Sequence, residues 1–513
     1  MEKERKRRGG RRQKQAEART SARIVNYRQL RHPFEPQKLF SDDRIAAIHE
    51  AALTMLETLG IKFLLPEARN ILRKAGAIVD DDSQMVRIGR EIVDDALKTA
   101  PKSIRLRAAN PIREIQYEPG ALVFTAGAGC PNATDAIRGR RPGSLQDFEE
   151  AIKLQQSFDV IHKHGPSAEP QDVAIQNRHY AMMRAQMTLG EKPMFVYARG
   201  RGQVTQSFEL IQLGLNLTDE EFRDGVWATT VINTNSPRQV DKPMAQGIID
   251  FARAGQMSII TPFCLAGAMA PVTVAGSLTL QHGEALACIT LAQITSPGAP
   301  VSYGGFGSNV DMKSGAPAFG TPEHMKMQLG SGQLARLIGL PWRSAAGSAS
   351  NVADTQGAIE NTMGLWGAMQ SNASMVVHSA GWLEGGLSFG YEKFITDIEA
   401  LQTIAELCAP TPADTAAIGM DALAEVEPGG HFFAAQHTME RYDTAFYEPL
   451  VADLSNFGAW TDSGANTATE RATAIWQSVL RDYQPPAHSE LAGERIVKYI
   501  ADETAAGGAA ILD

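Results

Sequence analysis

The sequence predicts an α/β protein built on a (β/α)8 TIM barrel, with an N-terminal α+β cap and a C-terminal helical extension. The main observation is one unit that recurs eight times between Leu122 and Cys408: a short apolar run, a loop rich in Gly, Asn or aromatic residues, and a helix-length amphipathic segment. Eight such units in a row are typical of a parallel barrel. The second observation is length, because 513 residues exceed the roughly 250 of a barrel and leave room at both ends.

The predicted elements alternate along the chain. The expected strands are 122–126, 160–164, 194–198, 226–232, 257–263, 301–306, 341–347 and 375–381. The expected helices are 144–158, 172–188, 203–215, 242–254, 273–294, 321–338, 354–372 and 391–407. Before them come a helix at 41–60, which Ser41 or Asp42 can cap and Gly60 can end, a helix at 66–75, and short alternating strands at 85–88, 103–108 and 114–118. These patterns predict a cap at 24–118, a barrel at 119–410 and a helical extension at 411–513.

The composition is that of an ordinary folded protein, with 43% hydrophobic and 21% charged residues. Four cysteines in so long a chain are no disulfide framework, and no secretory segment is present. No apolar run approaches the roughly 20 residues of a membrane span. We therefore expect a cytoplasmic protein that does not contact a membrane.

The charge is segregated along the chain. Residues 1–23 carry ten Lys or Arg residues against three Glu, a net charge of +7, so the remainder of the −9 chain carries −16. Such a run could anchor the chain to nucleic acid or a membrane, or steer an acidic protein, but terminal charge runs commonly have no packed partner. We expect a disordered basic tail, and the acidic remainder argues against a nucleic-acid enzyme.

The loops after the strands hold the candidate functional residues, because catalytic groups of barrel enzymes lie there. His162 and His164 alternate along one expected strand, which places both imidazoles on one face and is a known arrangement for metal ligands. No nearby carboxylate or cysteine completes a four-ligand set, so we expect a structural or substrate-contacting role and no metal site. The cysteines lack Cys-x-x-Cys spacing and are expected to be buried packing residues.

Aromatic and arginine side chains are concentrated on the same loops. The aromatic ones are Tyr197, Tyr303, Phe306, Trp382, Phe389 and Tyr391, in a chain with only 7% aromatic residues. Some of them must be packing, but several aromatic faces around a cavity are what a quaternary ammonium ligand needs. Arginines at 199, 201, 238 and 343 could hold a carboxylate bidentately, with surface solvation as the alternative for each.

Several motifs resemble one known family. GGFGSNVDMKSGAPAFGTPEHM (304–325), SAAGSASNVADTQGAIEN (344–361), HSAGWLEGGLSFGYEKFITDIE (378–399), EPGGHFFAAQHTMERY (427–442) and RGRRPGSLQDFEEA (138–151) are similar to the trimethylamine:corrinoid methyltransferase family. The likeness runs from about residue 30 to about residue 500 in the right order. It implies a (β/α)8 barrel, a homo-oligomer, and methyl transfer from an N-methylated amine to Co(I) of a corrinoid (cobalamin) presented by a separate partner protein, with no tightly bound cofactor of the chain's own.

One departure from the family bears on the substrate. Archaeal trimethylamine enzymes carry pyrrolysine in the loop after the seventh strand, whereas this chain has GSASNVAD at 347–354. The chain thus resembles the non-pyrrolysine branch, whose characterised members demethylate quaternary amines such as glycine betaine. A quaternary nitrogen is already cationic and leaves as a neutral tertiary amine, so no covalent activation is needed.

The sequence therefore predicts an amine:corrinoid methyltransferase acting on a betaine. We expect the ammonium to lie against Tyr303, Phe306, Trp382 and Tyr391. We expect polar orientation or electrostatic balance, and with it the catalytic role, from His162, Asn233, His378 and Glu384. The carboxylate holder is expected among Arg199, Arg201 and Arg343. Two alternatives remain at this point: a Zn-dependent barrel methyltransferase that uses the His-x-His pair with Cys130 or Cys264, and a catalytically idle betaine-binding protein that regulates or scaffolds a corrinoid protein.

Overall fold

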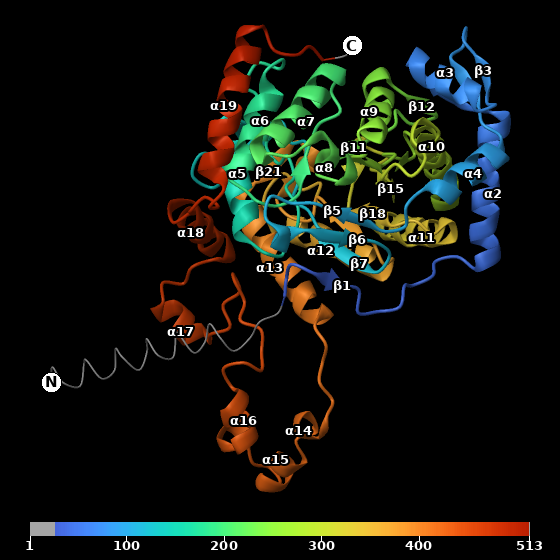
Figure 1. The fold of residues 1–513 in the computed structure, drawn as a ribbon. Helices are drawn as coiled ribbons and strands as arrows, with labels where there is room; N and C mark the ends of the chain where they lie inside the picture. Colours follow the sequence, from blue (N-terminus) through green and yellow to red (C-terminus); the bar gives the residue numbers. More distant parts are fainter. Residues whose placement is uncertain (1–25, 512–513) are drawn as a thin grey trace.

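The computed structural model describes residues 26–511 and has a mixed α/β fold around one curled, eight-stranded sheet (Figure 1). The strand order is β1 (Leu30–Arg31), β7 (Ala121–Phe124), β19 (Met375–Val377), β18 (Trp342–Ala345), β15 (Val301–Gly304), β13 (Met257–Ile260), β11 (Ala228–Ile232) and β10 (Met194–Phe195). The seven strands from β7 to β10 pair in parallel, and β1 pairs antiparallel to β7. Seven of the eight predicted strands are thus confirmed.

The eight predicted helices are present and follow the strands. They are α5 (Leu145–Ser157), α6 (Arg178–Thr188), α7 (Arg201–Leu215), α9 (Lys242–Arg253), α10 (Val274–Thr295), α11 (Pro322–Ile338), α12 (Thr355–Gln370) and α13 (Tyr391–Cys408), with a short α8 (Asp219–Asp224) before β11. Five of the eight begin at polar caps, because the side chains of Ser144, Asp241, Thr273, Thr321 and Asp354 accept otherwise unpaired backbone N–H groups of the first turns.

The predicted strand at 160–164 is not a regular strand. Its backbone lies between β7 and β10, because His162 N donates to Phe124 O (3.0 Å) and His164 N donates to Pro193 O (3.2 Å). The ladder is interrupted because the imidazole Nδ1 of His162 accepts the Phe124 N–H that a neighbouring carbonyl would take (2.9 Å). The prediction of eight equivalent parallel strands was wrong at this element.

A hairpin covers the amino ends of the strands. It consists of β5 (Ile104–Leu106) and β6 (Ile115–Tyr117), linked through the 3-10 turn η1 (Pro111–Arg113), and its apolar residues pack on Val123, Met257 and Met375 inside the sheet. The Tyr117 hydroxyl lies 2.5 Å from Ser302 Oγ of β15. With the amino ends covered, the cavity of the curled sheet lies at the carboxyl ends of the strands.

The N-terminal cap contains three helices and a small sheet. The helices are α2 (Asp42–Thr58), α3 (Pro66–Lys74) and α4 (Arg90–Thr99), and they lie against α10. The sheet joins β2 (Ile61–Phe63), β3 (Ile78–Asp80) and β4 (Met85–Arg87) to β12 (Gln239–Val240). The predicted helices at 41–60 and 66–75 are confirmed, whereas α4, β2 and β3 were not predicted.

Two more small sheets brace the loops at the carboxyl ends. One joins β8 (Asn132–Thr134), β9 (Arg141–Pro142), β20 (Trp382–Leu383) and β21 (Ser388–Gly390), with the turn η2 (Glu384–Gly386) between the last two. The other joins β14 (Leu265–Ala266), β16 (Ser308–Val310) and β17 (Pro317–Ala318). The loops that carry the predicted site are therefore hydrogen-bonded structures.

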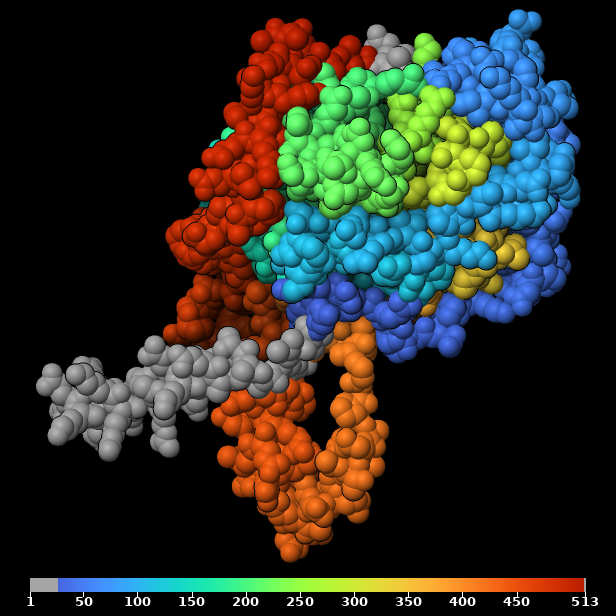
Figure 2. Space-filling model, viewed as in Figure 1, coloured from blue at the N-terminus to red at the C-terminus, as the bar shows by residue number. Residues whose placement is uncertain are grey.

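The C-terminal region divides into a protruding segment and two packed helices. Residues 409–466, which we call the arm, extend away from the body and contain α14 (Thr415–Ile418), α15 (Met420–Glu425), η3 (Phe432–Ala434), α16 (Gln436–Arg441) and α17 (Phe457–Asp462) (Figures 1 and 2). Helix α18 (Ala468–Arg481) then packs on α13 and α5, and α19 (Ser489–Ala505) packs on α6 and α7. None of the helices in residues 26–511 is long and apolar enough to cross a membrane.

Candidate active site

A cavity of about 400 Å³ opens at the carboxyl ends of the strands. The residues that line it come from β10, β11, β18, β19 and β20 or from the loops that follow strands, together with one residue of α9. They include Phe195, Tyr197, Arg199, Asn233, Met244, Phe263, Phe306, Arg343, His378 and Trp382. Volume and lining are typical of a small-molecule site, and the position is the one that barrel enzymes use.

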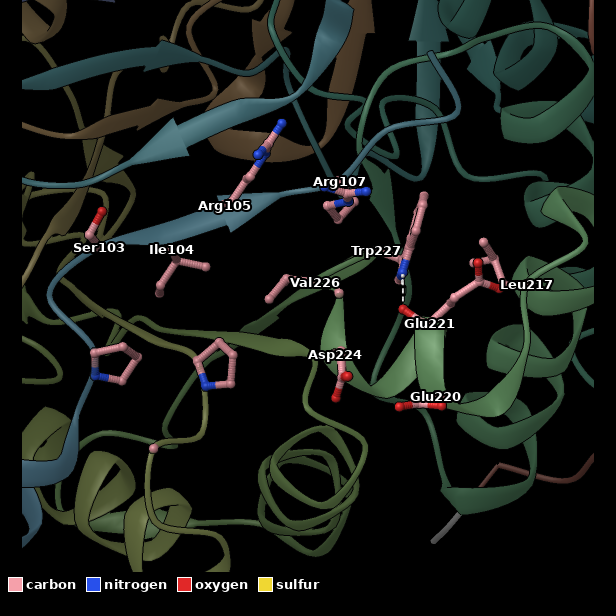
Figure 3. Close-up of a pocket in the computed structure, with 14 residues that line it drawn as sticks. Ser103, Ile104, Arg105, Arg107, Leu217, Glu220, Glu221, Asp224, Val226 and Trp227 are labelled. Carbon is pink, nitrogen blue, oxygen red and sulfur yellow. Dashed lines mark hydrogen bonds between the residues drawn. The ribbon is translucent and has the colours of Figure 1, made fainter. Parts of the chain in front are cut away.

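A larger hollow of about 690 Å³ lies at the opposite end, beside the β5–β6 hairpin (Figure 3). Its two arginines, Arg105 and Arg107, are paired with Glu114, and Arg107 also lies over the ring of Trp227. The indole Nε1 of Trp227 donates to Glu221 O (3.0 Å). Because these cations already have partners, we assign the site to the smaller cavity.

Phe306 is the centre of an aromatic wall in the smaller cavity. Its ring centroid lies 5.1 Å from those of Phe263 and Phe319, 5.4 Å from that of His378 and 5.7 Å from that of Trp382. The His378 and Trp382 rings stack with centroids 4.6 Å apart. These contacts fix the rings relative to one another, so the wall is formed before any ligand arrives.

The indole of Trp382 occupies a slot made by glycines from three loops. A Cβ on Gly347 would collide with Cε3 of the indole, one on Gly386 would lie 2.6 Å from Cζ2, and one on Gly127 would lie 3.2 Å from Cδ1. Gly347 and Gly386 also have φ angles of +103° and +107°, which L side chains rarely adopt. Only glycine therefore allows these loops to close around the ring.

His378 is a neutral, partly buried imidazole. Its Nδ1 accepts from Ala128 N (3.2 Å), so the remaining ring proton is on Nε2. Burial and, to a smaller extent, the Arg343 charge hold the pKa of His378 well below its usual value. The residue can thus orient a ligand by hydrogen bonding but does not supply an acidic proton at neutral pH.

Arg343 is a buried cation without a counter-charge among residues 26–511. The side chain is 1% exposed, and its Nε and Nη1 atoms have no hydrogen-bond partner within residues 26–511. Burial lowers the pKa of Arg343 to about 9. The guanidinium lies over the Phe306 ring, with Cζ 5.4 Å from the centroid. An unpaired buried guanidinium is costly, and a ligand carboxylate would satisfy it.

The other two predicted carboxylate holders already have acidic partners. Arg199 lines the cavity, but its Nη2 lies 2.5 Å from Glu169 Oε1 and its guanidinium stacks on Tyr197 at 4.0 Å. Burial and the Glu169 charge raise the pKa of Tyr197. Arg201 does not line the cavity: it begins α7, is 51% exposed and pairs with Glu67 and Asp250.

Tyr303 and Tyr391 do not line this cavity. Tyr303 points outward from β15 to α10, where its hydroxyl lies 3.1 Å from His282 Nδ1, because side chains alternate along a strand. Tyr391 is the first residue of α13, and its hydroxyl donates to Asp147 (3.0 Å) and Glu150 (2.6 Å). Both rings are packing residues outside the aromatic wall.

His162 and Glu384 also lie outside the cavity lining. Burial lowers the pKa of His162 to about 4, and its Nδ1 is engaged by Phe124 N. Glu384 is bound by Arg140 and by Ser388 Oγ (2.7 Å), so it fastens loop 382–390 and does not face the site. Of the expected polar groups, Asn233 and His378 are the two in the lining. In the described part of the chain, no group of three or more His, Cys, Asp or Glu side chains is placed to hold a metal ion.

Sequence reasoning missed Phe195 and Met244 as lining residues and did not single out Lys163. Lys163 lies beside the cavity: its Nζ is 5.1 Å from the Phe195 ring centroid and donates to His164 O (3.0 Å). Burial lowers the pKa of Lys163 to about 7. Because side chains alternate along an extended segment, the pattern that places His162 and His164 on one face places Lys163 on the other face. This alternation is the signal in the sequence that could have singled out Lys163.

Comparison with known proteins gives the family. A model described as trimethylamine methyltransferase (MTTB) matches residues 7–508. The chain belongs to this methyltransferase family. Glycine betaine methyltransferase of Desulfitobacterium hafniense (strain Y51) is 32% identical over 465 residues, covering 90% of this chain and 96% of the relative. Trimethylamine methyltransferase MttB of D. hafniense (strain DSM 10664 / DCB-2) is 28% identical over 450 residues (87% and 90%), and MttB of Methanosarcina thermophila is 25% identical over 453 (87% and 93%).

Among solved structures, monomethylamine methyltransferase (MtmB) of Methanosarcina barkeri aligns with a TM-score of 0.48 at 9% identity, over 91% of this chain and 88% of that one.

In this methyltransferase, the loop at 347–354 is tied down by a glutamate. Glu360 accepts hydrogen bonds from Ser348 Oγ (2.7 Å), Ala349 N (2.8 Å) and Ser350 N (3.2 Å). Backbone bonds from Glu384 and Gly385 to carbonyls of the same loop fasten it to loop 382–390. Loop 347–354 therefore forms the rigid back of the Trp382 slot.

Proposed function

We propose that this methyltransferase takes a methyl group from glycine betaine or a related betaine and transfers it to Co(I) of a corrinoid held by a separate protein. The observation that carries the proposal is Arg343, a buried guanidinium without a counter-charge beside an aromatic wall. A betaine has the two groups that such a site attracts, a quaternary ammonium and a carboxylate, in one small molecule.

The two ends of a betaine fit adjacent parts of the cavity. The carboxylate pairs with Arg343, whose Cζ lies 5.4 Å from the Phe306 centroid, and the ammonium lies against Phe306 and Trp382, whose centroids are 5.7 Å apart. The short spacing between the guanidinium and the rings favours a short spacer between carboxylate and nitrogen. Asn233 and neutral His378 line the same space and can orient the molecule.

The reaction is a displacement at the methyl carbon. The carbon–nitrogen bond breaks, its electron pair stays on nitrogen, and the amine leaves neutral. The partner's corrinoid supplies the cobalt nucleophile that accepts the methyl group. The cavity wall contributes by fixing one methyl toward the opening and by excluding water. The lining at Ala128, Gly129, Gly385 and Gly386 presents backbone in place of long side chains, which leaves room for a flat macrocycle to approach.

We further propose that segment 160–164 completes the sheet into a closed (β/α)8 barrel, because its backbone bonds reach both β7 and β10. We also propose that the chain forms a homo-oligomer. Chemical cross-linking with light scattering tests the oligomer, and hydrogen exchange of the His162 and His164 amides tests the closure.

The test of the activity is a substrate panel with free Co(I) cobalamin, followed by methylcobalamin absorbance. Glycine betaine, choline and trimethylamine are compared in wild type and in Arg343→Lys, with Arg201→Lys as the matched control. We expect betaine to be the best substrate and Arg343→Lys to lose betaine turnover selectively. Comparable rates from trimethylamine and betaine would contradict the proposal, and betaine binding without turnover would select an idle binding protein.

A further inference from the structure

The arm (409–466) exposes an apolar surface for which the body provides no cover. Large apolar side chains on it that are more than two-fifths exposed are Ile418, Met420, Leu423, Phe432, Phe433, Met439, Tyr442, Phe446, Leu454 and Phe457. Phe433, Phe446 and Phe457 are 80%, 83% and 78% exposed. Exposed apolar surface on this scale marks an interaction site.

The same surface is strongly acidic. The arm carries nine Asp and Glu residues against Arg441 alone, a net charge of −8, which is half of the −16 that follows residue 23. Carboxylates interspersed with exposed aromatic faces suit an arginine- and lysine-rich segment, because the cations pair with the carboxylates and stack on the rings while their aliphatic stems cover apolar surface. The rest of the chain between residue 24 and the C-terminus carries −8 as well, so it is no complementary partner.

The chain that directly follows the basic N-terminal segment lies at the root of the arm. The described chain starts at Asn26, and the Tyr27 hydroxyl donates to Glu406 Oε1 (2.6 Å) in the last turn of α13, three residues before the arm. Residues 1–23 carry +7. Fully extended, 23 residues span up to about 75 Å, enough to follow a 58-residue arm of short helices and turns.

We propose that residues 1–23 dock on the arm of the same chain. The charges of +7 and −8 nearly cancel, the exposed rings supply stacking faces for arginine, and the tether at Tyr27 gives the segment a high effective concentration at this surface. The proposal is independent of the substrate and of the methyl-transfer reaction.

The test measures tryptic cleavage within residues 1–23 of the full-length protein by mass spectrometry. The arm variant is Glu427→Gln, Asp443→Asn and Glu448→Gln, three exposed acids that have no ion pair within residues 26–511. The matched control is Asp94→Asn, Glu220→Gln and Asp224→Asn, three exposed acids of the body. The free peptide of residues 1–23 reports the activity of trypsin itself under each condition.

We expect about fivefold faster cleavage in the arm variant, and also in wild type at 1 M NaCl, where the screening length falls to about 3 Å. The control variant should match wild type. Equal cleavage of wild type and arm variant would overturn the proposal.

Two further outcomes would overturn it. The first comes from carbodiimide cross-linking of a mixture of ¹⁵N-labelled and unlabelled protein. If residues 1–23 of a labelled chain are linked to the arm of an unlabelled chain, the segment binds the arm of a second copy and not its own. Protection of residues 1–23 that appears only when duplex DNA is added would make the segment a nucleic-acid tail.

Discussion

Replacing Arg343 with methionine should stabilise the empty protein and abolish its selectivity for betaines. The pKa of Arg343 falls from 12.5 to about 9 on burial. Each pKa unit corresponds to about 1.4 kcal/mol, so the charged form is penalised by at most roughly 5 kcal/mol. Replacing a buried ion pair by apolar residues of similar volume often stabilises a protein, by up to about 4 kcal/mol, and Arg343 has no opposite charge among the described residues whose attraction would be lost. We therefore expect the free energy of unfolding of Arg343→Met to rise by about 1–3 kcal/mol without ligand.

The same substitution should weaken binding of any ligand that carries a carboxylate. Losing one partner of a desolvated charge pair costs about 2–5 kcal/mol, which is a factor of about 30 to 5,000 in affinity for glycine betaine. Choline has the same ammonium but no carboxylate, so its affinity should change less than about threefold.

Urea unfolding and isothermal titration calorimetry of the isolated protein measure both effects. Arg201→Met is the control, because Arg201 is half-exposed, paired with Glu67 and Asp250, and outside the cavity. A loss of stability in Arg343→Met, or an equal loss of choline and betaine affinity, would refute the assignment of Arg343 as an unpaired carboxylate holder.

Three further predictions concern the surroundings of the cavity. Trp382→Ala should weaken amine binding by roughly five- to thirty-fold, since a desolvated cation–π contact is worth about 1–2 kcal/mol. The control Trp366→Ala, on the outer face of α12, should bind the amine normally. Calorimetry with parallel melting curves separates a loss of ligand binding from a loss of stability. Gly347→Ala should displace the indole and weaken binding by about tenfold or more, while Gly315→Ala, with a similar positive φ but open space around it, should bind normally by the same titration. Burial lowers the pKa of Lys163 from 10.5 to about 7. Between these two pH values the unfolded chain binds more protons than the folded chain, and below pH 7 the charged lysine destabilises the fold by its full amount. The stability gained by Lys163→Met should therefore shrink by at most about 1.4 kcal/mol per pH unit as pH rises from 7 to about 10, and a gain independent of pH in urea titrations would contradict the burial of a titrating amine.

The fold was predictable where apolar periodicity decides the structure. Seven strands and all eight helices of the repeating unit lie where the sequence places them, since buried parallel strands are continuous apolar runs and five of the eight helices begin at Ser, Thr or Asp caps. The exception is 160–164, because the competitor for the Phe124 N–H is the His162 side chain, and no apolar pattern encodes that hydrogen bond.

The site was predictable to the level of loops but not of side-chain direction. Phe306, Trp382, His378 and Arg343 line the cavity, and their roles stay predictions. The Tyr303 side chain lies on the other face of its strand and points at α10. The choice among the arginines depends on partners distant in sequence: Arg201 pairs with Glu67, 134 residues away, and that contact exists only in the folded chain.

The titrating groups of the cavity argue for a leaving group that needs no proton. Those in its lining are Tyr197, Arg199, Arg343 and His378. The pKa of Tyr197 is raised and that of His378 lies well below neutrality, so neither the phenol nor the imidazole donates readily at pH 7. The two guanidiniums are cations, and Arg343 keeps its proton below a pKa of about 9. The proposed betaine substrate needs no proton donor, because a quaternary amine departs neutral once its methyl is attacked. The electrostatics of the wall thus agree with the proposed substrate class.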